Sequence, residues 1–260
     1  MSFTDDLSDR FFIDIIAGCD RLQIDPLDLL AVMMAESNVK ASAQNANSNA
    51  SGLIQFLPST LRGIGWSGTP QKFRRLSADD QLPCVERYFQ PFAHFGLNTL
   101  ARVYQVVFLP SSLSLGSSPD TVIVDRNGVN SGAYAGNRGL DTDGDGAITV
   151  GELEQAVDRH LNSPRWNEIA ARLNDAMGAA GGGNEGGSED DTVDPIDLRT
   201  QDGIANALEA LGFDRQSFEF IAAVKAFQQQ FGLTADGIVG PRTRAALASA
   251  LTDSGIVFSQ

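Results

Sequence analysis

Apolar side chains run almost without a break from Leu29 to Ala35, and this run predicts a helix that is buried on most of its faces. Asp25 is the expected N-cap, because its carboxylate can accept from the free N–H groups of the first turn. Pro26 has the backbone angle that a first helical turn needs. The apolar run ends at Glu36, so a carboxylate closes an otherwise apolar segment.

Further segments repeat apolar residues at helical spacing, which predicts a mainly α protein. The repeats are Cys84, Tyr88 and Phe92; Leu153, Ala156, Val157 and Leu161; Val224, Phe227 and Phe231; and Leu247 with Leu251. Residues 178–194 combine glycine with acidic and small polar residues, so we expect them to be a flexible linker. The chain would then hold a catalytic domain over residues 1–176, a linker over 177–196 and a small domain over 197–256.

The charge of the chain restricts its partners. The 260 residues carry a formal net charge of -14, and the Arg74-Arg75 pair is the main basic cluster, so a nucleic-acid partner is not expected. The segment FFIDIIAG (11–18) is short and interrupted by Asp14, so we expect neither membrane insertion nor a signal peptide.

Glu36 is the first candidate for chemistry. It lies at the negative end of its predicted helix and beside Met33, Met34 and Ala35, which solvate a charge poorly, so both effects favour the protonated acid. A general acid for glycosidic cleavage needs such a protonated carboxyl. After Glu36, the next acidic residue in the sequence is Asp79. This gap favours a mechanism with one carboxylate over the usual pair.

Two short motifs connect Glu36 with a known family. Glu36-Ser37 followed by residues 50–60 (ASGLIQFLPST) resembles the lytic transglycosylase branch of the lysozyme-like superfamily. Gly52 to Gln55 match its second motif with Ile54 in place of Met, and Arg102 to Gln105 are the counterpart of its third motif with Gln105 in place of Asn. The resemblance implies a lysozyme-like catalytic domain.

The family resemblance also implies a mechanism. Glu36 would protonate the glycosidic oxygen between N-acetylmuramic acid and N-acetylglucosamine. It would then act as base while the C6 hydroxyl of the sugar attacks, which gives a 1,6-anhydro product. The substrate-binding residues implied are Ser37, Gln55 and Tyr104.

Residues 141–152 (DTDGDGAITVGE) match the EF-hand calcium-loop pattern at every position. The expected ligands of a structural Ca²⁺ are Asp141, Asp143, Asp145, the Ala147 carbonyl, Thr149 and Glu152. The entering segment is rich in glycine and asparagine, so we expect an incomplete hand that acts as a structural clip.

The C-terminal sixty residues resemble the small three-helix peptidoglycan-binding domain. The matching residues are Phe227, Phe231, Gly232, Leu233, Asp236, Gly237, Gly240 and Thr243. Pro241 has the angle of a first helical turn.

The sequence therefore predicts a peptidoglycan-cleaving enzyme that acts outside the cytoplasm. Alternatives are a hydrolytic muramidase, a Cys84–His160 endopeptidase and a non-catalytic wall-binding protein. A phage lysin and an injected effector both fit the domain pairing. Their partners would include bacterial peptidoglycan and, for an effector, an immunity protein or a delivery machinery.

Overall fold

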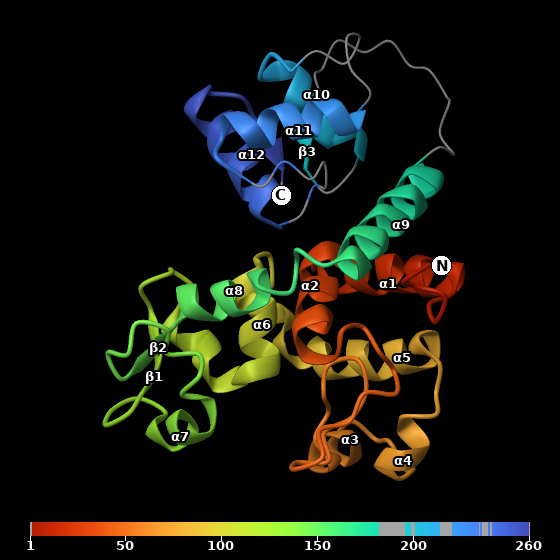
Figure 1. Ribbon diagram of the computed structural model, residues 1–260, viewed down its shortest axis with the longest axis vertical. Helices are drawn as coiled ribbons and strands as arrows, with labels where there is room; N and C mark the ends of the chain where they lie inside the picture. Colours follow the sequence, from red (N-terminus) through yellow and green to blue (C-terminus); the bar gives the residue numbers. More distant parts are fainter. Residues whose placement is uncertain are drawn as a thin grey trace. The chain divides into compact units, whose positions relative to one another are not determined.

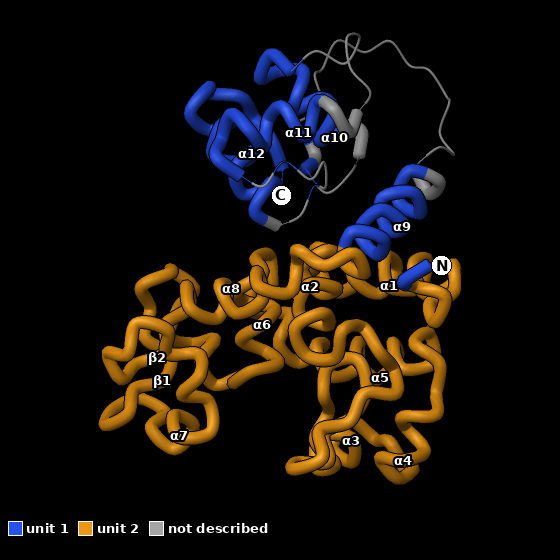
Figure 2. Tube along the Cα trace, in the orientation of Figure 1, with its two compact units in different colours: residues 1–3, 167–260 blue, residues 4–166 orange. Residues whose placement is uncertain are grey.

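The computed structural model describes residues 2–181, 196–198, 201–213, 220–233, 235, 239 and 241–259. The chain divides into two compact units, residues 4–166 and residues 1–3 with 167–260 (Figure 2). Both are mainly helical, as the sequence predicts. None of the described helices combines the length and apolar character needed to cross a membrane.

The first half of the unit 4–166 is a set of helices around one buried apolar helix (Figure 1). The elements in chain order are α1 (Asp9–Leu22), α2 (Pro26–Ser37), α3 (Pro58–Gly63), α4 (Pro70–Phe73), α5 (Ala78–Phe89), η1 (Gln90–Phe95) and α6 (Leu100–Phe108). α2 packs against α1 and α6, and α1 packs along α5. Almost every residue of α2 up to Met34 is buried, so this helix forms the centre of the unit.

The second half of this unit is less regular. It contains η2 (Pro110–Leu115), β1 (Val122–Asp125), η3 (Ser131–Ala133), α7 (Tyr134–Asn137), β2 (Ala147–Thr149) and α8 (Val150–Asp158). β1 and β2 pair antiparallel, with Val124 opposite Ile148. α8 packs against α2 and α6 and buries Leu153, Ala156 and Val157, which confirms the helix predicted after the calcium-loop motif. The helix ends at Asp158, so Leu161 lies beyond it.

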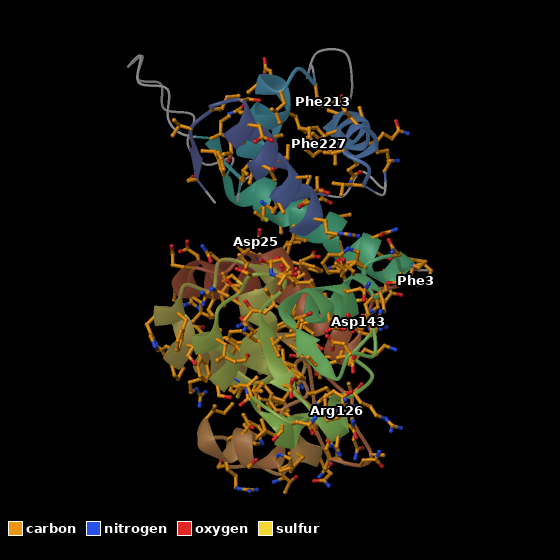
Figure 3. The ribbon with its side chains drawn as sticks, turned by 90° about the vertical axis from the view of Figure 1, so that its left-hand side faces the viewer. Phe3, Asp25, Arg126, Asp143, Phe213 and Phe227 are labelled. Atoms are coloured by element: carbon orange, nitrogen blue, oxygen red, sulfur yellow. The ribbon has the colours of Figure 1, made fainter. Side chains whose placement is uncertain are left out.

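The other unit contains most of α9 (Pro164–Gly181), followed by β3 (Ile196–Asp197), α10 (Gln201–Ala210), α11 (Phe220–Gln230), α12 (Pro241–Asp253) and β4 (Phe258–Ser259). Its core lies between α10, α11 and α12 and includes Leu208, Phe227, Leu247 and Leu251. The rings of Phe213 and Phe227 meet edge to face with centroids 5.4 Å apart (Figure 3).

Two sequence expectations for the C-terminal part fall partly outside the described residues. α9 continues to Gly181 and so includes the first residues of the predicted linker. The rest of that linker up to residue 195 lies outside the described residues, as do Asp236, Gly237 and Gly240. Phe231 stacks on buried Phe227 with ring centroids 4.3 Å apart, but 42% of Phe231 is exposed.

Candidate active site

The helix that carries Glu36 begins and ends as its sequence dictates. The Asp25 carboxylate accepts from Leu27 N–H at 2.8 Å, and Pro26 occupies the first turn. Asn38 follows the helix in the left-handed conformation. Glu36 is therefore held in the last turn of a buried helix, where its side chain stays partly accessible to solvent.

Burial controls the acidity of Glu36. Protein atoms surround most of the carboxyl, and this desolvation raises the pKa of Glu36 to about 7. A hydrogen bond from the Tyr104 hydroxyl acts in the opposite direction, because it stabilises the ionised carboxylate and so lowers the pKa. Burial has the larger effect. The carboxyl can therefore both give and take a proton near neutral pH.

Tyr104 comes from the middle of α6, which packs against α2. Its side chain is 8% exposed, and burial together with the charge of Glu36 raises the pKa of Tyr104 well above its usual range. The phenol therefore remains a hydrogen-bond donor. The structure thus brings together two of the residues that the family resemblance implies, Glu36 and Tyr104.

Ser37 connects the end of α2 to the segment of the second motif. Its buried hydroxyl oxygen lies 2.7 Å from the Leu53 carbonyl and 3.0 Å from the Met33 carbonyl. Both carbonyl oxygens can accept the one hydroxyl proton of Ser37. Ser37 therefore contacts the backbone of residues 52–55, and through it holds that segment beside Glu36.

Residues 51–56 form a tight turn in which Ser51 and Phe56 pair through two backbone hydrogen bonds of 3.0 and 2.9 Å. Gly52 has φ +79° and Gln55 has φ +51°, so the turn contains two left-handed residues. The Gln55 amide donates to the Gly52 carbonyl at 3.0 Å. The structure thus places Gln55 in the turn that Ser37 holds.

Two residues that support this site escaped the sequence reasoning. Gln81 is fully buried and accepts from Leu53 N–H at 3.0 Å, while its amide donates to the carbonyls of Ala41 and Phe73. Tyr88, expected as part of a core stripe, donates to the Val106 carbonyl of α6 at 2.9 Å. Burial raises the pKa of Tyr88, and the negative charge of Glu36 adds to this shift.

A usable signal for Gln81 existed in the sequence. Gln81, Val85 and Phe89 share one face of α5, so the amide interrupts an apolar stripe at a buried position. A buried amide needs several hydrogen-bond partners, and loops with tight turns have backbone groups to offer. A third such residue is Arg165, which donates to the carbonyl of Asn38 at the end of α2 at 2.8 Å. No local pattern marks it.

The acidic loop is a separate cluster (Figure 3 labels Asp143). Carboxylate oxygens of Asp141, Asp143 and Asp145 lie within 4.8 Å of one another, and this group could hold a metal ion. Asp141 accepts from Gly144 N–H at 2.8 Å, from Gly146 N–H at 3.0 Å and from the Tyr134 hydroxyl at 2.5 Å. These bonds fold the loop around its first carboxylate and lower the pKa of Asp141.

The end of this loop is a helix cap. Thr149 and Glu152 form a capping box at the start of α8. The Glu152 carboxylate accepts from Thr142 N–H at 2.6 Å and from Thr149 N–H at 2.9 Å. The Glu152 carboxylate therefore bridges the start and the end of the loop. In the calcium-loop pattern this last position supplies the bidentate ligand.

Cys84, the nucleophile of the alternative endopeptidase, is 4% exposed and belongs to the buried face of α5. Burial raises the pKa of the Cys84 thiol. A cysteine nucleophile needs the opposite shift.

Comparison with known families agrees with this geometry. Residues 15–81 match the model of the transglycosylase SLT domain, and residues 204–247 match that of a peptidoglycan binding domain. No curated protein and no solved structure matches the chain. The first match includes Glu36, Ser37 and the turn at residues 51–56, whereas Tyr104 lies beyond it. The chain therefore carries a lytic transglycosylase domain, which cleaves peptidoglycan between N-acetylmuramic acid and N-acetylglucosamine, and a C-terminal peptidoglycan-binding domain.

Proposed function

We propose that Glu36 is the acid and then the base of the transglycosylase reaction. The observation that carries this proposal is a half-buried carboxyl, at the end of a buried helix, whose pKa is about 7. Both protonation states are then populated near neutral pH, as a group with two successive roles needs.

In the first step, protonated Glu36 donates its proton to the glycosidic oxygen, and the bond from C1 of N-acetylmuramic acid to that oxygen breaks. The released N-acetylglucosamine keeps the proton as a hydroxyl. In the second step, ionised Glu36 takes the proton of the C6 hydroxyl while O6 bonds to C1. A 1,6-anhydro ring forms, and Glu36 is protonated again.

The other site residues have supporting roles in this proposal. The Tyr104 hydroxyl donates to the ionised carboxylate and so stabilises it between the two steps. Tyr104 and Gln55 also contact the sugar and orient it. Ser37 contributes to substrate binding by holding the turn that contains Gln55.

The test compares Glu36→Gln with wild type on purified peptidoglycan and analyses the products by mass spectrometry. Wild type should release muropeptides that are lighter than hydrolysis products by one water. Glu36→Gln should lose at least about a thousandfold in rate, because it can neither give nor take the proton.

Glu86→Gln is the matched control. It makes the same chemical change at a carboxylate that pairs with Arg21 on the surface, so it should stay active. Full activity of Glu36→Gln would disprove the assignment. Products that retain the water would identify a hydrolytic muramidase instead.

We further propose that residues 141–152 bind one structural Ca²⁺. Hard oxygen ligands suit this ion, and three carboxylates already converge in the loop. The Ala147 carbonyl, Thr149 and Glu152 would complete the ligand set of Asp141, Asp143 and Asp145. Bound Ca²⁺ would offset the mutual repulsion of these acids and fix the position of α8, which packs against α2.

We also propose the domain arrangement of a catalytic domain over residues 1–176, a linker over 177–196 and a wall-binding domain over 197–256. The peptidoglycan-binding match at residues 204–247 supports the last of these. The enzyme would act on the cell wall, either as a phage lysin or as an effector. Genomic neighbours distinguish the two: lysis or virion genes support the first, and a gene for an immunity protein supports the second.

A further inference from the structure

The turn that follows Glu36 has an unusual backbone. Asn38 and Val39 both adopt the left-handed conformation, with φ +57° and +52°; these two residues are called the exit turn below. A β-branched residue such as Val39 rarely adopts this conformation. The Val39 side chain is fully buried. Such strain persists only where the surroundings hold the backbone in place.

One side chain provides that support from far away in the sequence. Arg165 Nε donates to the Asn38 carbonyl at 2.8 Å, and its Nη2 donates to the Val39 carbonyl at 3.2 Å. The same guanidinium forms a bidentate pair with Asp6, with distances of 2.7 and 2.8 Å. Both carbonyls of the exit turn are therefore bonded to one planar group.

Arg165 is itself well fixed. It is the second residue of α9, and the Ser163 hydroxyl caps this helix by accepting from Trp166 N–H at 3.2 Å. Its neighbour Trp166 is 2% exposed, and Arg165 is 8% exposed. All these residues belong to the unit 4–166. The last turn of α2, Met34–Ser37, has no basic residue of its own, so Arg165 supplies the cation that favours a helix C-terminus.

We propose that Arg165 is a positioning residue for the transglycosylase reaction: its guanidinium fixes the exit turn and thereby keeps Glu36 at its half-buried place beside Tyr104. This inference rests on the proposed role of Glu36. Arg165 acts through the backbone of residues 38–39, since it donates to the carbonyls of both residues and pairs with Asp6.

A loss of Arg165 has a specific consequence for the pH dependence. Without its two bonds to the exit turn, the last turn of α2 loosens and the Glu36 carboxyl becomes more hydrated. The pKa of Glu36, which burial raises to about 7, then falls toward its ordinary value. The titratable side chains coupled to Glu36 among the described residues are Tyr104 on α6 and Tyr88 on α5. Both remain neutral in this range.

The experiment measures kcat and KM from pH 4 to 9 for Arg165→Met, Arg165→Lys and Asp6→Asn. Arg165→Met should lower kcat by about ten- to a hundredfold, because misplaced catalytic groups cost this much, while KM changes little. The limb on which activity declines with rising pH should move to lower pH. Arg165→Lys should behave similarly, since an ammonium cannot reach both carbonyls and Asp6 as the planar fork does.

Asp6→Asn tests the Arg165–Asp6 ion pair separately from the bonds between Arg165 and the exit turn. It removes the ion pair but leaves the bonds from Arg165 to the exit turn, so its pH profile should stay close to that of wild type. Arg21→Met is the matched control, because it breaks another bidentate pair of the same unit, with Glu86 at 2.7 and 2.8 Å. Arg21→Met should leave kcat and the pH profile unchanged, even if it lowers the melting temperature.

All variants are assayed at a temperature at which circular dichroism shows them folded; if Arg165→Met does not fold, Arg165→Lys decides. Wild-type kcat and pH profile in the folded Arg165 variant would overturn the proposal. A loss of kcat without a shift of the pH limb would overturn it too, since that is the result of a general structural role. An active Glu36→Gln variant would instead disprove the proposed function itself.

Discussion

At the scale of single residues, Glu36 shows how one carboxyl acquires two roles. Burial raises its pKa, and the Tyr104 hydrogen bond limits the rise. The balance of these two effects determines the pH at which the enzyme can start and finish its reaction.

The raised pKa of Glu36 predicts a pH-dependent effect of Glu36→Gln on stability. The folded state holds this proton up to a pH of about 7, whereas the unfolded chain releases it near 4.3. Between these values the native state binds more protons, so this group makes the wild type less stable as pH rises. Glu36→Gln has no such group, so it does not lose this stability as pH rises. The difference in melting temperature, variant minus wild type, should be larger at pH 8 than at pH 4, and equal differences would refute the raised pKa.

Tyr104→Phe tests the opposing effect. The hydroxyl lowers the pKa of Glu36, so its removal should move the alkaline limb of the kcat profile to higher pH. The same change should reduce kcat by about tenfold, because the ionised carboxylate loses a donor. Titration of kcat across this limb provides the measurement. A limb at unchanged pH would show that the hydroxyl does not act on Glu36.

At the scale of elements, the turn at residues 51–56 depends on Gly52. A Cβ atom at Gly52 would lie 2.3 Å from Gln81 Oε1 and 2.7 Å from Phe73 Cε1. Both neighbours belong to the packed interior, and φ is +79°. Gly52→Ala should therefore lower the free energy of unfolding by more than about 2 kcal/mol.

Gly63→Ala is the control for this change. Gly63 lies in α3, and apart from its chain neighbours and the backbone of its own helix no described heavy atom is within 4 Å of its added Cβ. Stability should stay the same or rise by up to about 1 kcal/mol. Chemical denaturation of both variants gives the comparison. Equal stabilities would mean that the turn can shift away from Gln81.

The acidic loop gives a second prediction at this scale. Ca²⁺ should raise the melting temperature of wild type relative to chelator, because a ligand that binds only the folded state stabilises it. The double variant Asp143→Ala with Glu152→Gln should lose this difference. A calcium-dependent shift that survives in the double variant would place the ion elsewhere, and superimposed wild-type curves would exclude a site at residues 141–152.

At the scale of the whole molecule, the catalytic domain and the wall-binding domain are separable in this proposal. Deleting residues 178–260 should leave cleavage of soluble glycan fragments nearly unchanged, since Glu36, Tyr104 and Arg165 all precede them. Activity on intact sacculi should fall, because the enzyme loses the higher effective concentration that wall binding provides. Rates on both substrates are the measurement, and an equal loss on both would show that the deleted part completes the active site.

The sequence by itself determined the parts of this protein that depend on local patterns. The α2 helix follows from an apolar run with an Asp-Pro start, and the acidic loop follows from the spacing of its carboxylates. Short motifs were enough to predict the transglycosylase and peptidoglycan-binding domains that the family models match. Local patterns carry such information because helix caps and loop ligands lie within a few residues of one another.

Only the tertiary structure decided which distant residues support the site. Gln81 contacts Leu53 across 28 positions, and Arg165 contacts Asn38 across 127. The order of the chain does not show that Tyr104 reaches Glu36, because this depends on how α6 packs against α2. The acidity of Glu36 likewise depends on the atoms that surround it, and these come from several elements. Desolvation and long-range hydrogen bonds are properties of the packed molecule, so local sequence patterns do not reveal them.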